Sequence, residues 1–177
     1  MTSRRSVLLG ASLLPLVAGF HAWRAARGGT TAPVVIAMRG TPRGEQVWFE
    51  PQGLWVAPGQ TIRFVNEDKA NVHSATAFHP DLYGRERRIP QTAQPWTSEL
   101  LLPGEHYEVS LQVPGVYDYY CLPHLAHGMI GRIVVGTPED VKWTQEDYHR
   151  SNRPTGLPGT FPDLNDVLAT RRVPPRK

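Results

Sequence analysis

The sequence predicts an all-β fold: a two-sheet β-sandwich with an additional segment at each end. Short runs rich in β-branched and aromatic residues recur along the middle of the chain, and Pro-Gly pairs at 58–59, 103–104 and 114–115 separate several of them. Apolar and polar residues alternate within these runs, as in 61–66, so one face of each strand is expected to be buried. Short strands at this spacing are typical of a β-sandwich.

The expected strands follow one another from the first apolar run to the last. In the run 107–113 every second residue is apolar, which places those side chains on the inner face. In the next run Tyr117, Tyr119 and Cys121 share one face by the two-residue period, so Cys121 points inward at the end of its strand. The expected strands are 33–38, 47–51, 54–56, 61–66, 107–113, 116–121 and 130–135.

The length of 177 residues predicts one domain, 28–136, with an extension at each end. Residues 1–27 are expected to be an export signal, because Arg4-Arg5 precede an apolar run that is short for a membrane span. This pattern resembles a twin-arginine signal, which implies a periplasmic or otherwise extracytoplasmic protein. No clear small-x-small cleavage site follows, so an uncleaved N-terminal anchor stays open, as does an ordinary core helix.

The C-terminal extension, 137–177, contains two possible short helices at 138–150 and 162–172. It has too few apolar residues to form a second core. We expect it to pack partly on the sandwich or to extend freely.

Charge and cysteine content restrict the possible functions. The formal net charge is +3, but four of the basic residues lie in the first 27, and the remainder has 15 basic against 16 acidic residues. A nearly neutral body gives no argument for nucleic-acid binding. The single cysteine, Cys121, excludes an internal disulfide and leaves a free thiol, a metal ligand or a link to another chain.

Cys121, His124 and Met129 lie on one short loop between two expected strands, and this donor set favours copper. A second histidine would complete a His₂Cys trigonal set with a long axial Met bond, which is the blue-copper arrangement. Zinc rarely uses Met, and a structural zinc site usually needs more than one Cys. A catalytic thiol would lack a third group to orient its base. A buried Cys with chance neighbours is the remaining alternative.

The loop 121–131, CLPHLAHGMIG, resembles the copper loop of plastocyanins and pseudoazurins, which has Cys-x₂-His-x₄-Met with Pro before the His and Gly before the Met. Pro123 and Gly128 occupy those two places. The segment 49–66 also resembles the second and third strands of plastocyanin-like proteins. The resemblance implies a cupredoxin-like Greek-key sandwich that carries one electron on a mononuclear type 1 copper.

The same resemblance implies which histidine completes the site. In this family a His follows the Val-Asn end of the strand that here is 61–66, and His73 matches that place. The implied ligands are thus His73, Cys121, His124 and Met129. His79 is the competitor for the remote position. His106 and His127 are assigned no role in binding.

The implied function is electron transfer, without enzymatic activity, through transient contact with redox partner proteins near His124. Leu122, Pro123 and Leu125 would form an apolar docking patch, and we expect a monomer that meets a membrane only if the N-terminal segment is uncleaved. Copper capture or delivery is the alternative. A multicopper oxidase is disfavoured, because it would need histidines beside the Cys, where Tyr120 and Leu122 stand. A two-domain copper nitrite reductase would need a second domain.

Residues 79–98 depart from the compact family pattern, because they are long, polar and rich in proline. They are expected to form an excursion on the surface. Three arginines, Arg85, Arg87 and Arg88, lie close together in it. Two interpretations of the excursion stay open. It is a solvated loop with no role, or it serves as a docking surface for an acidic partner or as a cover over the copper site.

Overall fold

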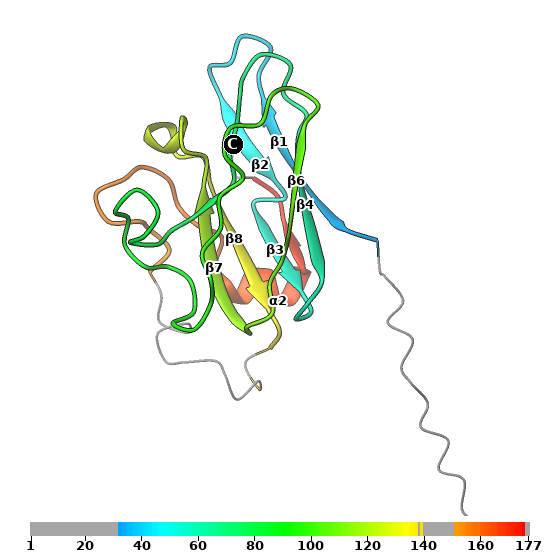
Figure 1. The fold of residues 1–177 in the computed structure, drawn as a ribbon, viewed down its shortest axis with the longest axis vertical. Helices are drawn as coiled ribbons and strands as arrows, with labels where there is room; N and C mark the ends of the chain where they lie inside the picture. Colours follow the sequence, from blue (N-terminus) through cyan, green and yellow to red (C-terminus); the bar gives the residue numbers. More distant parts are fainter. Residues whose placement is uncertain (1–31, 138, 140–150, 176–177) are drawn as a thin grey trace, which may run out of the picture. The chain divides into compact units, whose positions relative to one another are not determined.

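The computed structural model describes residues 32–137, 139 and 151–175, which form a sandwich of two β-sheets (Figure 1). The predicted export signal, 1–27, lies outside the described residues. The first sheet has the order β2-β1-β4-β6 and the second the order β5-β7-β8-β3-β9. The strands of the first sheet are β1 (Val34–Gly40), β2 (Val47–Glu50), β4 (Thr61–Asn66) and β6 (His106–Ser110). Those of the second are β3 (Gly53–Val56), β5 (Thr76–Ala77), β7 (Gly115–Tyr120), β8 (Ile130–Val135) and β9 (Arg172–Val173).

Strand pairing follows a crossover topology that confirms the predicted all-β sandwich. β1 runs parallel to β4, with Val34 opposite Ile62 and Met38 opposite Asn66, and β3 runs parallel to β8. The remaining named pairs are antiparallel. The predicted strand 107–113 is too long, because β6 ends at Ser110 and the carbonyl of Leu111 accepts from Gly59 N–H at the neighbouring turn.

The parallel pairing fixes the direction of the first strand relative to the metal-ligand candidates. The C-terminal ends of β4 and β7 lead to His73 and Cys121, which lie at one end of the sandwich. Because β1 is parallel to β4, Val34 lies at the opposite end, and the chain enters the sandwich there (Figure 1).

An aromatic cluster fills the core below Cys121. The rings of Phe49, Phe64 and Tyr119 meet edge to face, with centroids 4.7 to 6.3 Å apart. Gly131 makes room for this cluster, since a Cβ there would lie 2.3 Å from the Tyr119 ring. The three aromatic side chains are fully buried, and Cys121 belongs to the same apolar cluster.

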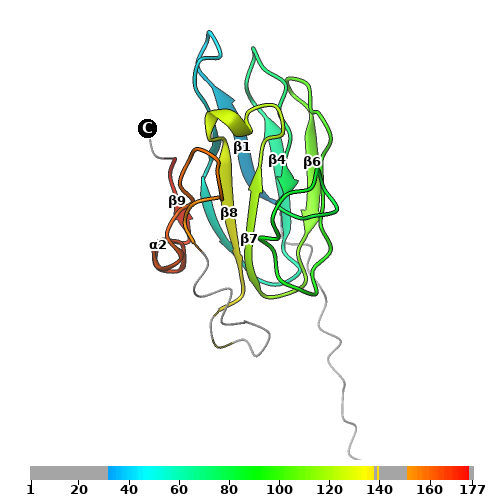
Figure 2. The same ribbon diagram turned by 90° about the vertical axis from the view of Figure 1, so that its left-hand side faces the viewer.

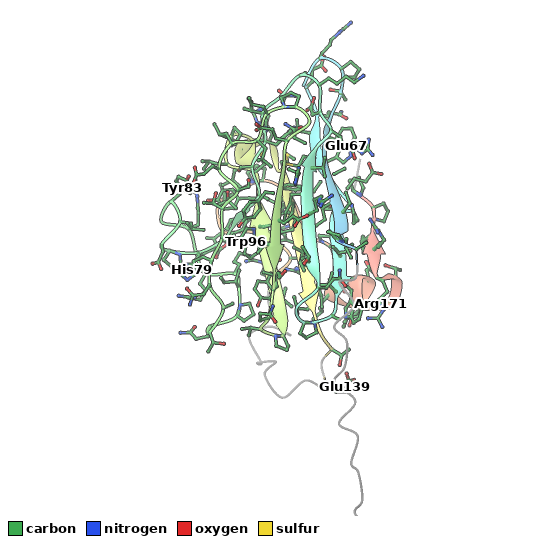
Figure 3. The ribbon with its side chains drawn as sticks, turned by 45° about the vertical axis from the view of Figure 1, so that its right-hand side comes forward. Glu67, His79, Tyr83, Trp96, Glu139 and Arg171 are labelled. Carbon is green, nitrogen blue, oxygen red and sulfur yellow. The ribbon has the colours of Figure 1, made fainter. Side chains whose placement is uncertain are left out.

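The segment 79–98 is only in part the surface excursion that the sequence predicts. Ile89, Ala93 and Trp96 are buried in the main core, and the carbonyl of Trp96 accepts from Ala77 N–H in β5. Trp96 lies against the sandwich in Figure 3, whereas the half-exposed Tyr83 lies at the outer edge. The prediction is wrong for the buried residues because the segment covers β7, which is buried along its whole length.

The described part of the C-terminal extension packs on the second sheet. Helix α2 (Leu164–Thr170) confirms the second predicted helix, whereas the first, 138–150, lies outside the described residues except for residue 139. Asp163 caps α2 by accepting from Asn165 N–H. Val167 is buried against β7 and β8, and β9 pairs with β3 at the sheet edge (Figure 2).

A buried ionic network attaches this extension to the sandwich. Asp118 accepts from Arg88 Nε at 2.9 Å and from Arg132 Nε at 2.7 Å. Arg132 also donates to the carbonyl of Pro162, and both guanidinium groups lie over the ring of Phe161. Each buried charge thus has a partner, as burial requires.

Across the described residues, none of the helices combines the length and the apolar composition that crossing a membrane requires.

Candidate metal centre

Three donor atoms converge at the end of the sandwich where β7 ends. Cys121 Sγ lies 3.5 Å from Nδ1 of His73 and 3.4 Å from Nδ1 of His124. All three donor atoms lie within 4.8 Å of one another. The two imidazole rings have centroids 4.9 Å apart. Within the part of the chain that the structure describes, no other group of three His, Cys, Asp or Glu residues converges as closely.

The loop after β7 folds back so that Met129 returns to the thiol. Cys121 N–H donates to the carbonyl of Met129 at 3.0 Å, and Met129 N–H donates to the carbonyl of His124 at 3.2 Å. Between His124 and Met129 lies the 3₁₀ turn η1 (Leu125–His127), which ends at Gly128 with a φ of 75°. A positive φ of this size favours glycine. Met129 is 1% exposed and lies in the same apolar cluster as Cys121.

The Cys121 thiol is fully buried, and burial and hydrogen bonding act on its pKa in opposite directions. Burial raises the pKa of this thiol to about 11, while the N–H of Ser74, 3.3 Å from Sγ, acts in the opposite direction. The hydroxyl of Ser74 accepts from Leu122 N–H at 2.7 Å. Ser74 thus holds the segment that carries His73 against the loop that carries Cys121.

The His73 ring is held from its other side by a carboxylate. Asp68 Oδ2 lies 3.0 Å from Nε2 of His73, and both side chains are buried. Burial raises the pKa of Asp68, but hydrogen bonds from Asn71 and Ala70 and the contact with His73 bring the pKa below its ordinary value. Burial lowers the pKa of His73, against the opposing effect of Asp68. A neutral imidazole, the form that binds metals, is therefore favoured.

His124 is only half-buried, unlike His73. Its pKa is lowered by burial and then by the neighbouring imidazoles of His73 and His127. Of the three residues of the predicted docking patch, Pro123 is exposed and Leu122 is half-buried. Leu125 does not belong to that patch: it is 4% exposed and packs in the cluster of Phe78, Tyr120 and Phe161, which the C-terminal extension completes.

The structure brings three of the four predicted ligands into one cluster and the fourth, Met129, into the apolar shell around the thiol. His79 lies outside the cluster, and its Nδ1 accepts from Asp81 N–H at 3.2 Å. His106 begins β6, and His127 is exposed. Sequence reasoning missed Asp68 and Ser74. Their positions, five residues before and one residue after His73, were the available signals.

Comparisons with known proteins agree with this geometry. The family described as copper binding proteins, plastocyanin/azurin family, matches residues 36–136. Plastocyanin from Prochlorothrix hollandica is 35% identical over 124 residues, which cover 70% of this chain and 88% of that protein. Chloroplastic plastocyanin from Hordeum vulgare is 36% identical over 87 residues, or 49% of this chain and 54% of that protein.

Coverage differs among the relatives, and the chain spans about half the length of the first curated relatives that it matches. Among solved structures, the pseudoazurin from Sinorhizobium meliltoi superposes with a TM-score of 0.45 at 32% identity, covering 59% of this chain and 76% of that one. The family match extends over more than half of the sequence and includes the whole donor cluster. The chain therefore belongs to the plastocyanin/azurin family of copper-binding proteins.

Proposed function

We propose that this protein is a one-electron carrier in which His73, Cys121 and His124, together with Met129, would hold one copper ion. The observation that supports the ligand set is the convergence of one thiol and two imidazole nitrogens, 3.4 and 3.5 Å from the sulfur. A His₂Cys set with a weak Met ligand is the donor set of blue-copper sites.

The bound copper would supply the one-electron couple, and the chain's own residues would keep the donors in place during transfer. The Ser74 N–H points at the sulfur, and the backbone hydrogen bonds of Met129 close the loop on Cys121 and His124. Apolar side chains surround Cys121 and keep water from the thiolate. Donors held in this way move little when the charge changes, so little reorganisation opposes transfer.

The electron would leave through His124. His73 and Cys121 are fully buried and Met129 is 1% exposed, whereas His124 is only half-buried. A partner protein that docks on Leu122 and Pro123 would come closest to the copper through this ring. Such redox contacts are small in area and short-lived. We propose that the protein acts as a monomer and catalyses no reaction of its own.

We also propose that the protein works outside the cytoplasm. The support is the sequence of residues 1–27, where Arg4-Arg5 precede an apolar run. Expression with the pair changed to Lys-Lys, followed by cell fractionation, tests this location. Unchanged export of the Lys-Lys variant would contradict a twin-arginine route.

Optical and EPR spectra of the copper-loaded protein test the proposed site. We expect an intense visible charge-transfer band that Cys121→Ala removes, because the band requires a copper–sulfur bond. Ser151→Ala, which removes a hydroxyl in the C-terminal extension, is the control and should leave the band unchanged. A Cys121→Ala variant that stays intensely coloured would contradict the assignment.

Electron exchange separates a carrier from a protein that delivers copper. A carrier should exchange electrons with its own oxidised form repeatedly and keep its copper. Transfer of the ion to a metal-free acceptor protein at a comparable rate would instead support copper delivery.

A further inference from the structure

Asp68 makes a contact with His73 that copper binding does not itself require. The Oδ2–Nε2 distance is 3.0 Å, and the side chains of His73 and Asp68 are 0% and 2% exposed. Water and salt therefore cannot screen the carboxylate from the ring. The same ring presents its other nitrogen, Nδ1, to Cys121.

A dense set of hydrogen bonds immobilises the Asp68 carboxylate. It accepts from Ala70 N–H at 2.8 Å, from Asn71 Nδ2 at 2.9 Å and, more weakly, from Asn71 N–H at 3.4 Å. The Asp68 N–H donates to Asn66 Oδ1, and the Asn66 amide donates to the carbonyl of Leu101. The carboxylate is therefore held at the His73 ring by the chain that follows β4.

Gly40, at the end of β1, leaves the space that this carboxylate occupies. A Cβ at Gly40 would lie 2.0 Å from Asp68 Oδ2 and 2.8 Å from Cγ. No larger residue fits there unless the carboxylate moves away from its present position. The arrangement thus needs an acid at one position and the absence of a side chain at another.

We propose that Asp68 is a positioning residue that orients the His73 ring for copper and lowers the reduction potential of the site. This inference rests on the proposed function. A carboxylate that accepts from Nε2–H fixes the tautomer in which Nδ1 carries the free lone pair, and it makes the imidazole a stronger donor. A buried negative charge beside a ligand favours Cu(II) over Cu(I), which lowers the potential.

Asp68→Asn tests the charge, because the amide keeps the shape of the side chain. In the copper-loaded protein we expect the potential to rise as the preference for Cu(II) falls about tenfold, which is 59 mV for a one-electron couple. The control is Asp81→Asn, because Asp81 also lies near a histidine, at 3.5 Å from Nδ1 of His79, but is 79% exposed. The control should leave the potential unchanged.

Gly40→Ala tests the position without removing the charge. The added methyl displaces the carboxylate, so the potential should rise in the same direction as in Asp68→Asn. An unchanged potential in both variants, with the wild-type optical spectrum retained, would overturn the role of the carboxylate.

The nitrogen NMR shifts of the metal-free wild-type protein provide a readout that needs neither copper nor a variant. We expect His73 to carry its proton on Nε2 and none on Nδ1. A proton on Nδ1 would overturn the positioning role. If the wild-type protein binds no copper but shows the Nε2 proton, the proposed function fails while the orientation by Asp68 stands.

Discussion

His73 and His79 are six residues apart in the sequence, but only one of them reaches the thiol. His73 Nδ1 lies 3.5 Å from Cys121 Sγ, while His79 Nδ1 accepts from a backbone N–H in its own turn. Both side chains are buried, so burial alone does not distinguish them.

His73→Ala should therefore abolish or deform the type 1 copper spectrum, because the trigonal set loses a nitrogen. His79→Ala and His127→Ala should both keep the spectrum, since neither side chain belongs to the cluster. EPR of the three copper-loaded variants decides the assignment. Loss of the type 1 signal in His79→Ala alone would show that the remote ligand is His79.

Met129 is expected to tune the site more than to hold the ion. Met129→Leu keeps the buried volume nearly constant, so the loop should stay folded and copper should still bind. The potential should rise, because a sulfur donor that favours Cu(II) is removed. Voltammetry of the loaded protein measures this change. An unchanged potential would mean that Met129 is not a ligand.

At the level of secondary structure, regular alternation and the loop motif made much of the molecule predictable. β4 appears with the predicted bounds, 61–66, and Cys121 points inward at the end of β7 as its period indicates. The Cys-x₂-His-x₄-Met spacing identified the loop because its geometry is local. The remote ligand was found only through a resemblance, since nothing local joins His73 to residue 121.

Other features depend on partners far away in the sequence and could not be predicted. Arg132 was expected in a strand, but a strand pattern does not reveal that Asp118 and the carbonyl of Pro162 satisfy its charge. The segment 79–98 was interpreted as a surface loop because it is long, polar and contains several prolines, and these properties do not reveal which of its side chains are buried. Asp68 was assigned no role from the sequence, because its role depends on the 3.0 Å distance to His73.

The C-terminal extension is expected to stabilise the domain without forming part of the metal centre. Phe161 is fully buried, packs on Phe78 and lies under two guanidinium groups. Phe161→Ala should lower the free energy of unfolding by about 3–5 kcal/mol, as large-to-small core changes do. Urea denaturation measures the loss.

The matched control for that change is Tyr83→Ala, which truncates an aromatic ring that is 51% exposed. It should alter the stability little. Both variants should retain the type 1 spectrum, because neither side chain belongs to the donor cluster. Equal stabilities for the two variants would contradict a structural role for the extension.

For the molecule as a whole, the buried ionic network changes which arginines can attract a partner. Arg88 was grouped in the sequence with Arg85 and Arg87, but it is 5% exposed and paired with Asp118. Of these three arginines, the half-buried Arg85 and Arg87 stay available to steer an acidic partner. Steering acts on the association rate, and salt screens it over about 10 Å at 0.1 M.

The double change Arg85→Gln and Arg87→Gln should slow electron transfer to an acidic redox partner at low salt and leave the potential unchanged. The rates of variant and wild type should converge as salt is added. Leu122→Gln should slow transfer at every salt concentration, because salt does not screen apolar contact. Stopped-flow rates over a salt series provide the measurement. Equal rates at low salt would leave the two arginines without a steering role.

The parallel pairing of β1 with β4 has a practical consequence for wiring the protein to an electrode. The chain enters the sandwich at the end opposite the thiol and the imidazoles. If an electrode is attached at residue 32, the length of the strands separates it from the metal ligands. Electron transfer to that electrode should therefore be slow and the current weak. Attachment at residue 126, which is exposed on the loop beside His124, would instead place the electrode next to the ring through which the electron is proposed to leave.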